Sequence, residues 1–271
     1  MELVGFGARD RASVDRQLLV SATHKTCRIL GLIKMTLIKL ENIRLDYPVA
    51  DISHYSLKRL VLDTLTGRKR ELDYVRALDG IDLEISDGER IGLYGPNGSG
   101  KSTLLRLLAG IYPPTKGTML VNGTLAPLLG LGAGIRPDMS SVDNIQMLLR
   151  LESTKPTQQL IDQIWAFTEL EDRYRGYPLK TFSSGMQMRV LFAVATYASR
   201  DILLLDEWLS VTDAEFQKKA EERMNEMVNK SRALIIASHD MGLLQRLCTK
   251  IIHMRSGAIE KIETVDQTPS A

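Results

Sequence analysis

The chain has 271 residues, of which 44% are apolar and 25% are charged, a composition typical of a globular protein with a sizeable core. Its net charge of +2 is too small to indicate nucleic-acid or membrane binding by itself. No apolar run approaches the ~20 residues of a membrane-spanning helix, and no secretory signal is recognisable, so we expect a chain that does not cross a membrane alone. Cys27 and Cys248 lie far apart without metal-ligand spacing, and we interpret them as thiols in a reducing compartment rather than as a disulfide.

The two ends of the chain differ in pattern from the rest. Residues 1–34 show no clear periodicity, whereas Met35 opens a strand-like alternation. We interpret residues 1–34 as a disordered extension or a translation-start artefact, with an amphipathic membrane-surface segment as the alternative. Residues 266–271 are interpreted as a tail. The intervening residues 35–265 are predicted to form the functional domain.

In chain order, the first half of this domain alternates strands with polar turns. A strand is predicted over residues 36–47, followed by a basic insertion at 49–75 whose leucine spacing allows a short amphipathic helix. Alternating apolar residues predict a half-buried strand at 77–85. A short apolar strand at 91–94 then leads through a glycine-rich segment into a helix from 101 to about 109.

The second half of the domain places helices between short apolar strands. Strands are predicted at 118–121, 124–131, 202–205 and 234–237, with a closing hairpin at 251–254 and 259–262; helices are predicted at about 140–152, 157–174, 187–199 and 213–230. This alternation predicts an α/β protein with a parallel sheet and a helical insert.

The glycine-rich segment matches all four fixed positions of the pattern G-x-x-x-x-G-K-[ST]. Such a loop wraps a phosphate chain, because its glycines let the backbone approach closely and its amides point at the phosphate oxygens. The lysine reaches the terminal phosphates, the serine hydroxyl is placed to ligate Mg²⁺, and the helix N-terminus adds its positive dipole. The predicted nucleotide-binding residues are Gly95, Pro96, Asn97, Gly98, Ser99, Gly100, Lys101, Ser102 and Thr103.

Two carboxylates follow the apolar strand at 202–205. Asp206 and Glu207 would therefore lie at the C-terminal edge of a parallel sheet, where ligands bind. Asp206 is predicted to hold Mg²⁺ through its water shell, and Glu207 to polarise the attacking water. Taken without the phosphate loop, a solvated acidic pair after a buried strand is the alternative interpretation.

These motifs occur in the order and spacing of an ABC-transporter nucleotide-binding subunit. The chain also resembles that family at Phe182-Ser183-Ser184-Gly185-Met186, Ser210-Val211-Thr212-Asp213 and Ser238-His239-Asp240, and the resemblance covers about residues 36–263. It implies a P-loop NTPase core with a parallel sheet, an antiparallel β portion and a helical subdomain at about 135–190. It also implies a homodimer that binds ATP and Mg²⁺ and hydrolyses the ATP.

The same resemblance assigns roles to further residues. In the family, the signature segment contacts the γ-phosphate of ATP held by the other subunit, and here its matching residues are Ser183, Ser184 and Gly185. Ser184 replaces a usual glycine, and Met186 a usual glutamine. His239 resembles the catalytic switch histidine that contacts the γ-phosphate. Asp213 falls in the loop that the family places at the dimer interface.

Several of these segments resemble one branch of the family, the ATPase subunits of polysaccharide exporters. The features that carry this resemblance are the sequence of residues 182–186, the loop at 130–134, residues 213–216 and the basic insertion. They imply export of a lipid-linked polysaccharide such as O-antigen, together with an integral membrane permease, at the cytoplasmic face of the bacterial inner membrane. The alternatives are an ABC ATPase for a drug, lipid, capsule or teichoic acid, and a soluble ABC ATPase; no nucleic-acid partner is expected.

Two family positions remain to be assigned. An aromatic residue upstream of the phosphate loop usually stacks on adenine; Tyr74 lies nearest the expected place, and Tyr47 is its rival. The glutamine loop of the family should fall near residues 128–132, where this chain has no glutamine. The chain therefore departs from the family pattern there.

Overall fold

A computed structural model describes residues 35–48, 74–129, 134–198, 200–207 and 214–265. The described residues from Leu37 onward belong to one compact unit. The predictions made for residues 1–34, for most of the basic insertion and for the tail therefore lie outside the described residues.

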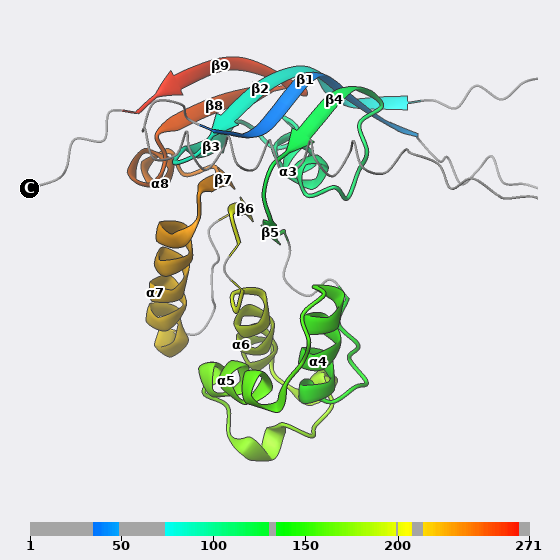
Figure 1. The fold of residues 1–271 in the computed structure, drawn as a ribbon, viewed down its shortest axis with the longest axis vertical. Helices are drawn as coiled ribbons and strands as arrows, with labels where there is room; N and C mark the ends of the chain where they lie inside the picture. The colour runs from blue at the N-terminus through cyan, green and yellow to red at the C-terminus, as the bar shows by residue number, and fades with distance from the viewer. Residues whose placement is uncertain (1–34, 49–73, 130–133, 199, 208–213, 266–271) are drawn as a thin grey trace, which may run out of the picture. The chain divides into compact units, whose positions relative to one another are not determined.

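The described strands form two sheets (Figure 1). The first has the order β2-β1-β4 and consists of β1 (Thr36–Pro48), β2 (Tyr74–Ser86) and β4 (Lys116–Val121). The second has the order β5-β6-β7-β3-β8-β9 and consists of β3 (Arg90–Tyr94), β5 (Leu125–Leu128), β6 (Ile202–Asp206), β7 (Ala233–Ala237), β8 (Lys250–Arg255) and β9 (Ala258–Thr264). Neighbouring strands from β5 to β8 are parallel, whereas β9 pairs antiparallel with β8 and β4 antiparallel with β1. The predicted fold class is confirmed.

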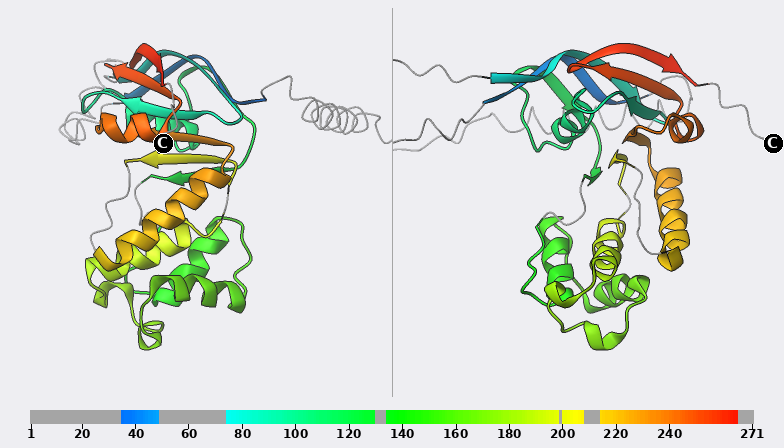
Figure 2. Two further views of the ribbon diagram at one scale, coloured as in Figure 1. Left: turned by 90° about the vertical axis from the view of Figure 1, so that its left-hand side faces the viewer. Right: turned by 180° about the vertical axis from the view of Figure 1, so that it is seen from behind.

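The helices fall into two groups (Figure 2). Those that follow strands of the large sheet are α3 (Lys101–Leu108), α7 (Ala214–Lys230) and α8 (Met241–Leu247). Those that pack with one another around a core of their own are α4 (Ser141–Leu151), α5 (Gln158–Thr168) and α6 (Ser184–Ala195). Two single-turn 3₁₀ helices, Asp172–Tyr174 and Leu179–Thr181, connect α5 to α6. None of the helices in the described ranges is long and apolar enough to cross a bilayer.

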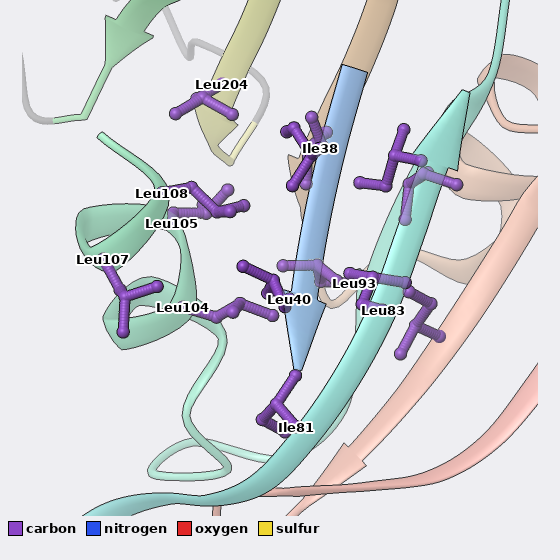
Figure 3. Close-up of a cluster of buried hydrophobic side chains, with 14 of the residues drawn as sticks. Ile38, Leu40, Ile81, Leu83, Leu93, Leu104, Leu105, Leu107, Leu108 and Leu204 are labelled. Atoms are coloured by element: carbon purple, nitrogen blue, oxygen red, sulfur yellow. The ribbon is translucent and has the colours of Figure 1, made fainter. Parts of the chain in front are cut away.

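The large sheet is buried on both faces, which explains the near-continuous apolar runs of its central strands. Alternate side chains of β6 and β7 divide between two cores. Leu204 and Ile235 join a core with α3 and the small sheet, in which Leu104 and Leu105 point toward β1 (Figure 3). Leu205 and Ile236 face the other way and pack with α7 and α8. Cys248 belongs to this second core, and its burial raises the pKa of the thiol to about 12.

Several predicted boundaries were wrong, and one helix was missed. The helix predicted over 157–174 ends at Thr168, because Glu169 adopts a left-handed conformation with φ of 58°. Helix α6 ends at Ala195 rather than near residue 199. At this end the Thr196 hydroxyl donates to the carbonyl of Phe192. Strand β5 stops at Leu128. Helix α8 was not predicted at all.

A buried asparagine ties the start of α4 to the loop before it. Asn144 is fully buried, and its Nδ2 donates to the carbonyls of Arg136 (2.9 Å), Met139 (3.2 Å) and Ser140 (2.9 Å). Its Oδ1 accepts from the backbone N–H of Arg136 at 2.8 Å. One side chain thus satisfies one backbone donor and three backbone acceptors in the segment that leads into α4.

We predict that Asn144→Ala lowers the free energy of unfolding by about 2–3 kcal/mol, because it leaves buried backbone groups without partners. Urea unfolding followed by circular dichroism measures the change. Asn229→Ala is the matched control, since Asn229 is exposed on α7 and its loss should cost less than about 0.5 kcal/mol. Equal midpoints for the two variants would show that the Asn144 bonds do not hold the loop.

Candidate nucleotide site

The glycine-rich loop lies between β3 and α3, at the C-terminal edge of the large sheet. Two of its glycines are required by the geometry. A Cβ at Gly95 would lie 2.3 Å from the carbonyl oxygen of Met254, and Gly100, with φ of 105°, forms the N-cap of α3. Gly100 has no side chain to cap the helix, so the first amides of α3 remain available to an anion.

Lys101 lies across the loop that precedes it. Its ammonium donates to the carbonyl of Gly95 at 2.7 Å and to that of Pro96 at 3.1 Å. This position holds a positive charge over the loop, where the predicted phosphates would lie. The expected role of Lys101 is compatible with this geometry.

Ser102 and Asp206 come together from distant parts of the sequence. The Ser102 hydroxyl donates to Oδ1 of Asp206 at 3.0 Å. A hydroxyl and a carboxylate are oxygen ligands of the kind that Mg²⁺ prefers, so the pair fits the predicted metal site. Within the described ranges no group of three or more His, Cys, Asp or Glu side chains is arranged to hold a metal ion. An ion here would take its remaining ligands from substrate phosphates and water, which is usual for Mg²⁺.

Glu207 and His239 form a second polar pair next to this site. Oε1 of Glu207 lies 2.9 Å from Nδ1 of His239, and both side chains are well exposed. Glu207 has a φ of 72°, a conformation that is rare for residues other than glycine. Its backbone N–H donates to the carbonyl of Ala237, which extends the ladder between β6 and β7 by one residue. Strain of this kind is concentrated at functional sites.

These groups border one cavity of about 660 Å³. It is lined by residues 97–103 of the predicted loop together with Asp206, Glu207 and His239. Tyr47, the rival aromatic residue, also lines the cavity. The remaining lining residues were not indicated by the sequence: Val75, Arg76, Ala77, Ala237, Ser256 and Gly257. The structure therefore brings the phosphate loop, both carboxylates and the histidine to one site, and it adds walls from β1, β2 and the β8–β9 turn.

The structure favours Tyr47 over Tyr74 as the aromatic residue of the site. Tyr47 lines the cavity, and its ring packs edge-on against Tyr112 with centroids 5.2 Å apart. Burial raises the pKa of its hydroxyl, which a hydrogen bond with Thr103 partly offsets. Tyr74 is 60% exposed and is not among the described residues that line the cavity. Proximity in sequence pointed to Tyr74, whereas the pairing of strands brings Tyr47 to the loop.

The signature residues are not among those that line this cavity. Ser183 is the N-cap of α6, where its hydroxyl accepts from the backbone N–H of Met186 at 3.2 Å, and Ser184 and Gly185 form the first helical turn. The sequence reasoning missed Gln187, whose amide donates to the carbonyls of Leu179 and Phe182 and so fixes the approach to α6. Asp213, residues 210–212 and most of the loop at 130–134 lie outside the described residues.

Comparison with known proteins shows which family the chain resembles. Residues 78–210 match the family model described as ABC transporter. The O-antigen export system ATP-binding protein RfbE of Yersinia enterocolitica is 40% identical over 83% of this chain and 97% of its own length. The teichoic acids export ATP-binding protein TagH of Listeria monocytogenes is 31% identical over 84% of this chain and 69% of its own. Among solved structures, the ATP-binding cassette MJ0796, a dimer with ADP and phosphate, has a TM-score of 0.62 and 19% identity, over 85% of this chain and all of its own.

We predict that Tyr47→Ala raises the dissociation constant for ATP roughly tenfold, because stacking on a base contributes about 1–3 kcal/mol. Fluorescence titration with ATP measures this change. Tyr74→Ala is the matched control and should change the constant less than twofold. Binding of inorganic tripolyphosphate should be the same in both variants, since it has no base. A larger effect of Tyr74→Ala than of Tyr47→Ala would reverse the assignment.

Proposed function

The chain belongs to the ABC transporter family as an ATP-binding subunit with ATPase activity, and we propose that it powers the export of a lipid-linked polysaccharide through a separate membrane permease. The observation that carries the site assignment is the convergence of Lys101, the Ser102–Asp206 pair and the Glu207–His239 pair on one cavity.

In the proposed mechanism, each group at the sheet edge has one task. Lys101 and the amides at the start of α3 hold the β- and γ-phosphates of ATP. Ser102 and Asp206 would hold Mg²⁺, whose charge would offset that of the phosphates. Glu207 accepts a hydrogen bond from the attacking water and polarises it, and His239 orients the Glu207 carboxylate through the 2.9 Å contact. Positioning and electrostatics of this kind supply most of the catalysis in phosphoryl transfer.

We propose that a second copy of the chain completes each site. Ser183 and Gly185 lie at the N-terminus of α6, which is the kind of feature that binds phosphate, but they do not line the cavity of their own chain. Contact with ATP held by another subunit, as implied by the family resemblance, would give them a ligand. ATP would then bind both subunits and favour the homodimer by mass action.

The proposed cargo follows from the relatives rather than from the cavity. One relative is named for O-antigen export and another for teichoic acid export. A lipid-linked, O-antigen-like polysaccharide is the cargo we favour, because the O-antigen protein is the more similar of the two and matches over nearly its whole length. A teichoic acid is the second candidate. The permease places the subunit at the cytoplasmic face of the inner membrane.

We predict that Glu207→Gln binds ATP as the wild-type chain does but lowers steady-state hydrolysis by at least about 10²-fold, because it removes the group that polarises water. With ATP and Mg²⁺ the variant should also change from monomer to dimer. Phosphate release measures the first effect, and light scattering the second. Glu222→Gln, which changes an exposed carboxylate of α7, should leave turnover unaltered.

Two results separate the parts of this proposal. Hydrolysis by Glu207→Gln at the wild-type rate would remove Glu207 from the role of base. Adding Ser183→Arg to Glu207→Gln should prevent the dimer, because it places bulk and positive charge at the N-terminus of α6. A dimer that still forms in the double variant would contradict contact between Ser183 and the partner's ATP.

For the cargo, we predict that deletion of the gene leaves completed glycan on its lipid carrier inside the cell and removes it from the surface. The reason is that assembly continues while translocation lacks its ATPase. Surface labelling and analysis of extracted carrier lipids measure the two pools. Complementation with wild type should restore export, and complementation with Glu207→Gln should not. Normal surface glycan in the deletion strain would contradict polysaccharide as the cargo.

A further inference from the structure

The turn between β8 and β9 forms part of the nucleotide cavity. Ser256 and Gly257 occupy this turn, and both line the cavity that contains the phosphate loop. Both have positive φ angles, 48° for Ser256 and 81° for Gly257. None of the roles assigned above uses this turn. It lies more than 150 residues further along the chain than the phosphate loop that it borders.

Hydrogen bonds connect the turn to two neighbours. The backbone N–H of Gly257 donates to the carbonyl of Ser99, in the middle of the phosphate loop, at 3.0 Å. The carbonyl of Gly257 accepts from the N–H of Asp79, on β2, at 2.9 Å. Ser99 is only 2% exposed, so its carbonyl bond lies in a largely dehydrated place. A single residue thus bridges the loop and β2.

The turn, the phosphate loop and β2 are packed so closely that several of their glycines leave no room for a Cβ. A Cβ at Gly257 would lie 2.6 Å from the carbonyl oxygen of Ala77, and one at Gly95 would lie 2.3 Å from that of Met254. A Cβ at Gly100 would lie 3.1 Å from the Ala77 oxygen and 3.3 Å from Cα of Gly257. All three of the nearest atoms to a Cβ at Gly257 are backbone atoms of Ala77 and Leu78, so no flexible side chain could move aside there.

From these contacts we propose that the β8–β9 turn positions the phosphate loop, with Gly257 as the positioning residue. The inference rests on the proposed binding of ATP at this loop. The turn fixes the carbonyl of Ser99, so the backbone of the loop is held in one conformation before phosphate binds. Preorganisation of this kind raises affinity, because the loop loses less conformational freedom when it binds.

The test compares Gly257→Ala with Gly88→Ala. Gly88 has nearly the same left-handed conformation, with φ of 83°, but a Cβ there would meet nothing within 4 Å. Both variants lose stability through the backbone, whereas only Gly257→Ala pushes the turn away from Ala77 and the loop. The dissociation constant for ATP should rise about tenfold in Gly257→Ala, as expected for the loss of about one hydrogen bond, and less than twofold in Gly88→Ala. Thermal melting without nucleotide reports the stability of each variant.

A second measurement needs no variant. In the wild-type chain, ATP should slow amide hydrogen exchange in residues 254–258 as well as in the phosphate loop, and should leave residues 86–89 unchanged. Equal ATP affinities of the two alanine variants, or protection of the loop without protection of the turn, would overturn the inference. The proposed function has its own test, because Lys101→Ala should lose ATP binding while the turn remains intact. ATP binding that is absent in the wild-type chain would contradict the function itself.

Discussion

The parallel register of β6, β7 and β3 is the constraint on which the site depends. Asp206 lies opposite Ala237, and Ala237 lies opposite Leu93, so the three strands end level with one another. Because side chains alternate along a strand, a slip by one residue would move every apolar side chain of a strand to the wrong core. Burial on both faces therefore holds the register. The register in turn delivers the residues after each strand to one edge: the acid pair after β6, the histidine after β7 and the phosphate loop after β3.

The polar groups at this edge are already oriented by one another. The Lys101 ammonium bonds to backbone carbonyls of the loop, Ser102 bonds to Asp206, and Glu207 contacts His239. A ligand that replaces such partners gains only the difference between the old and new bonds, which is why the net value of a hydrogen bond is far below its gross value. Affinity for phosphate must then come from groups that have no hydrogen-bond partner to lose and are already in position before the ligand binds. The amides at the start of α3 are such groups, because Gly100 leaves them without a side-chain cap.

Much of this arrangement could be predicted from the sequence, because the strongest signals are local. The strands β6 and β7 are apolar runs, and the phosphate loop is a contiguous pattern. Helix α8 was missed because it is only seven residues long, although Asp240 caps it by accepting from the N–H of Leu243. Tyr47 was given only as the rival of Tyr74 for a different reason. Tyr47 reaches the loop through strand pairing and packing on Tyr112, which depend on residues far away in the sequence.

The same distinction explains why no motif marks the β8–β9 turn. Gly257 has the conformation of many turn glycines, and only the folded chain reveals that its neighbours are Ala77 and Ser99. Ala77 and Ser99 both line the cavity, the first from β2 and the second from the phosphate loop. Two walls of the cavity, the phosphate loop and β2, thus both contact the β8–β9 hairpin. A shift of that hairpin would move both walls together, which is why we propose that ATP affinity depends on the C-terminal hairpin as well as on the motif that predicts binding.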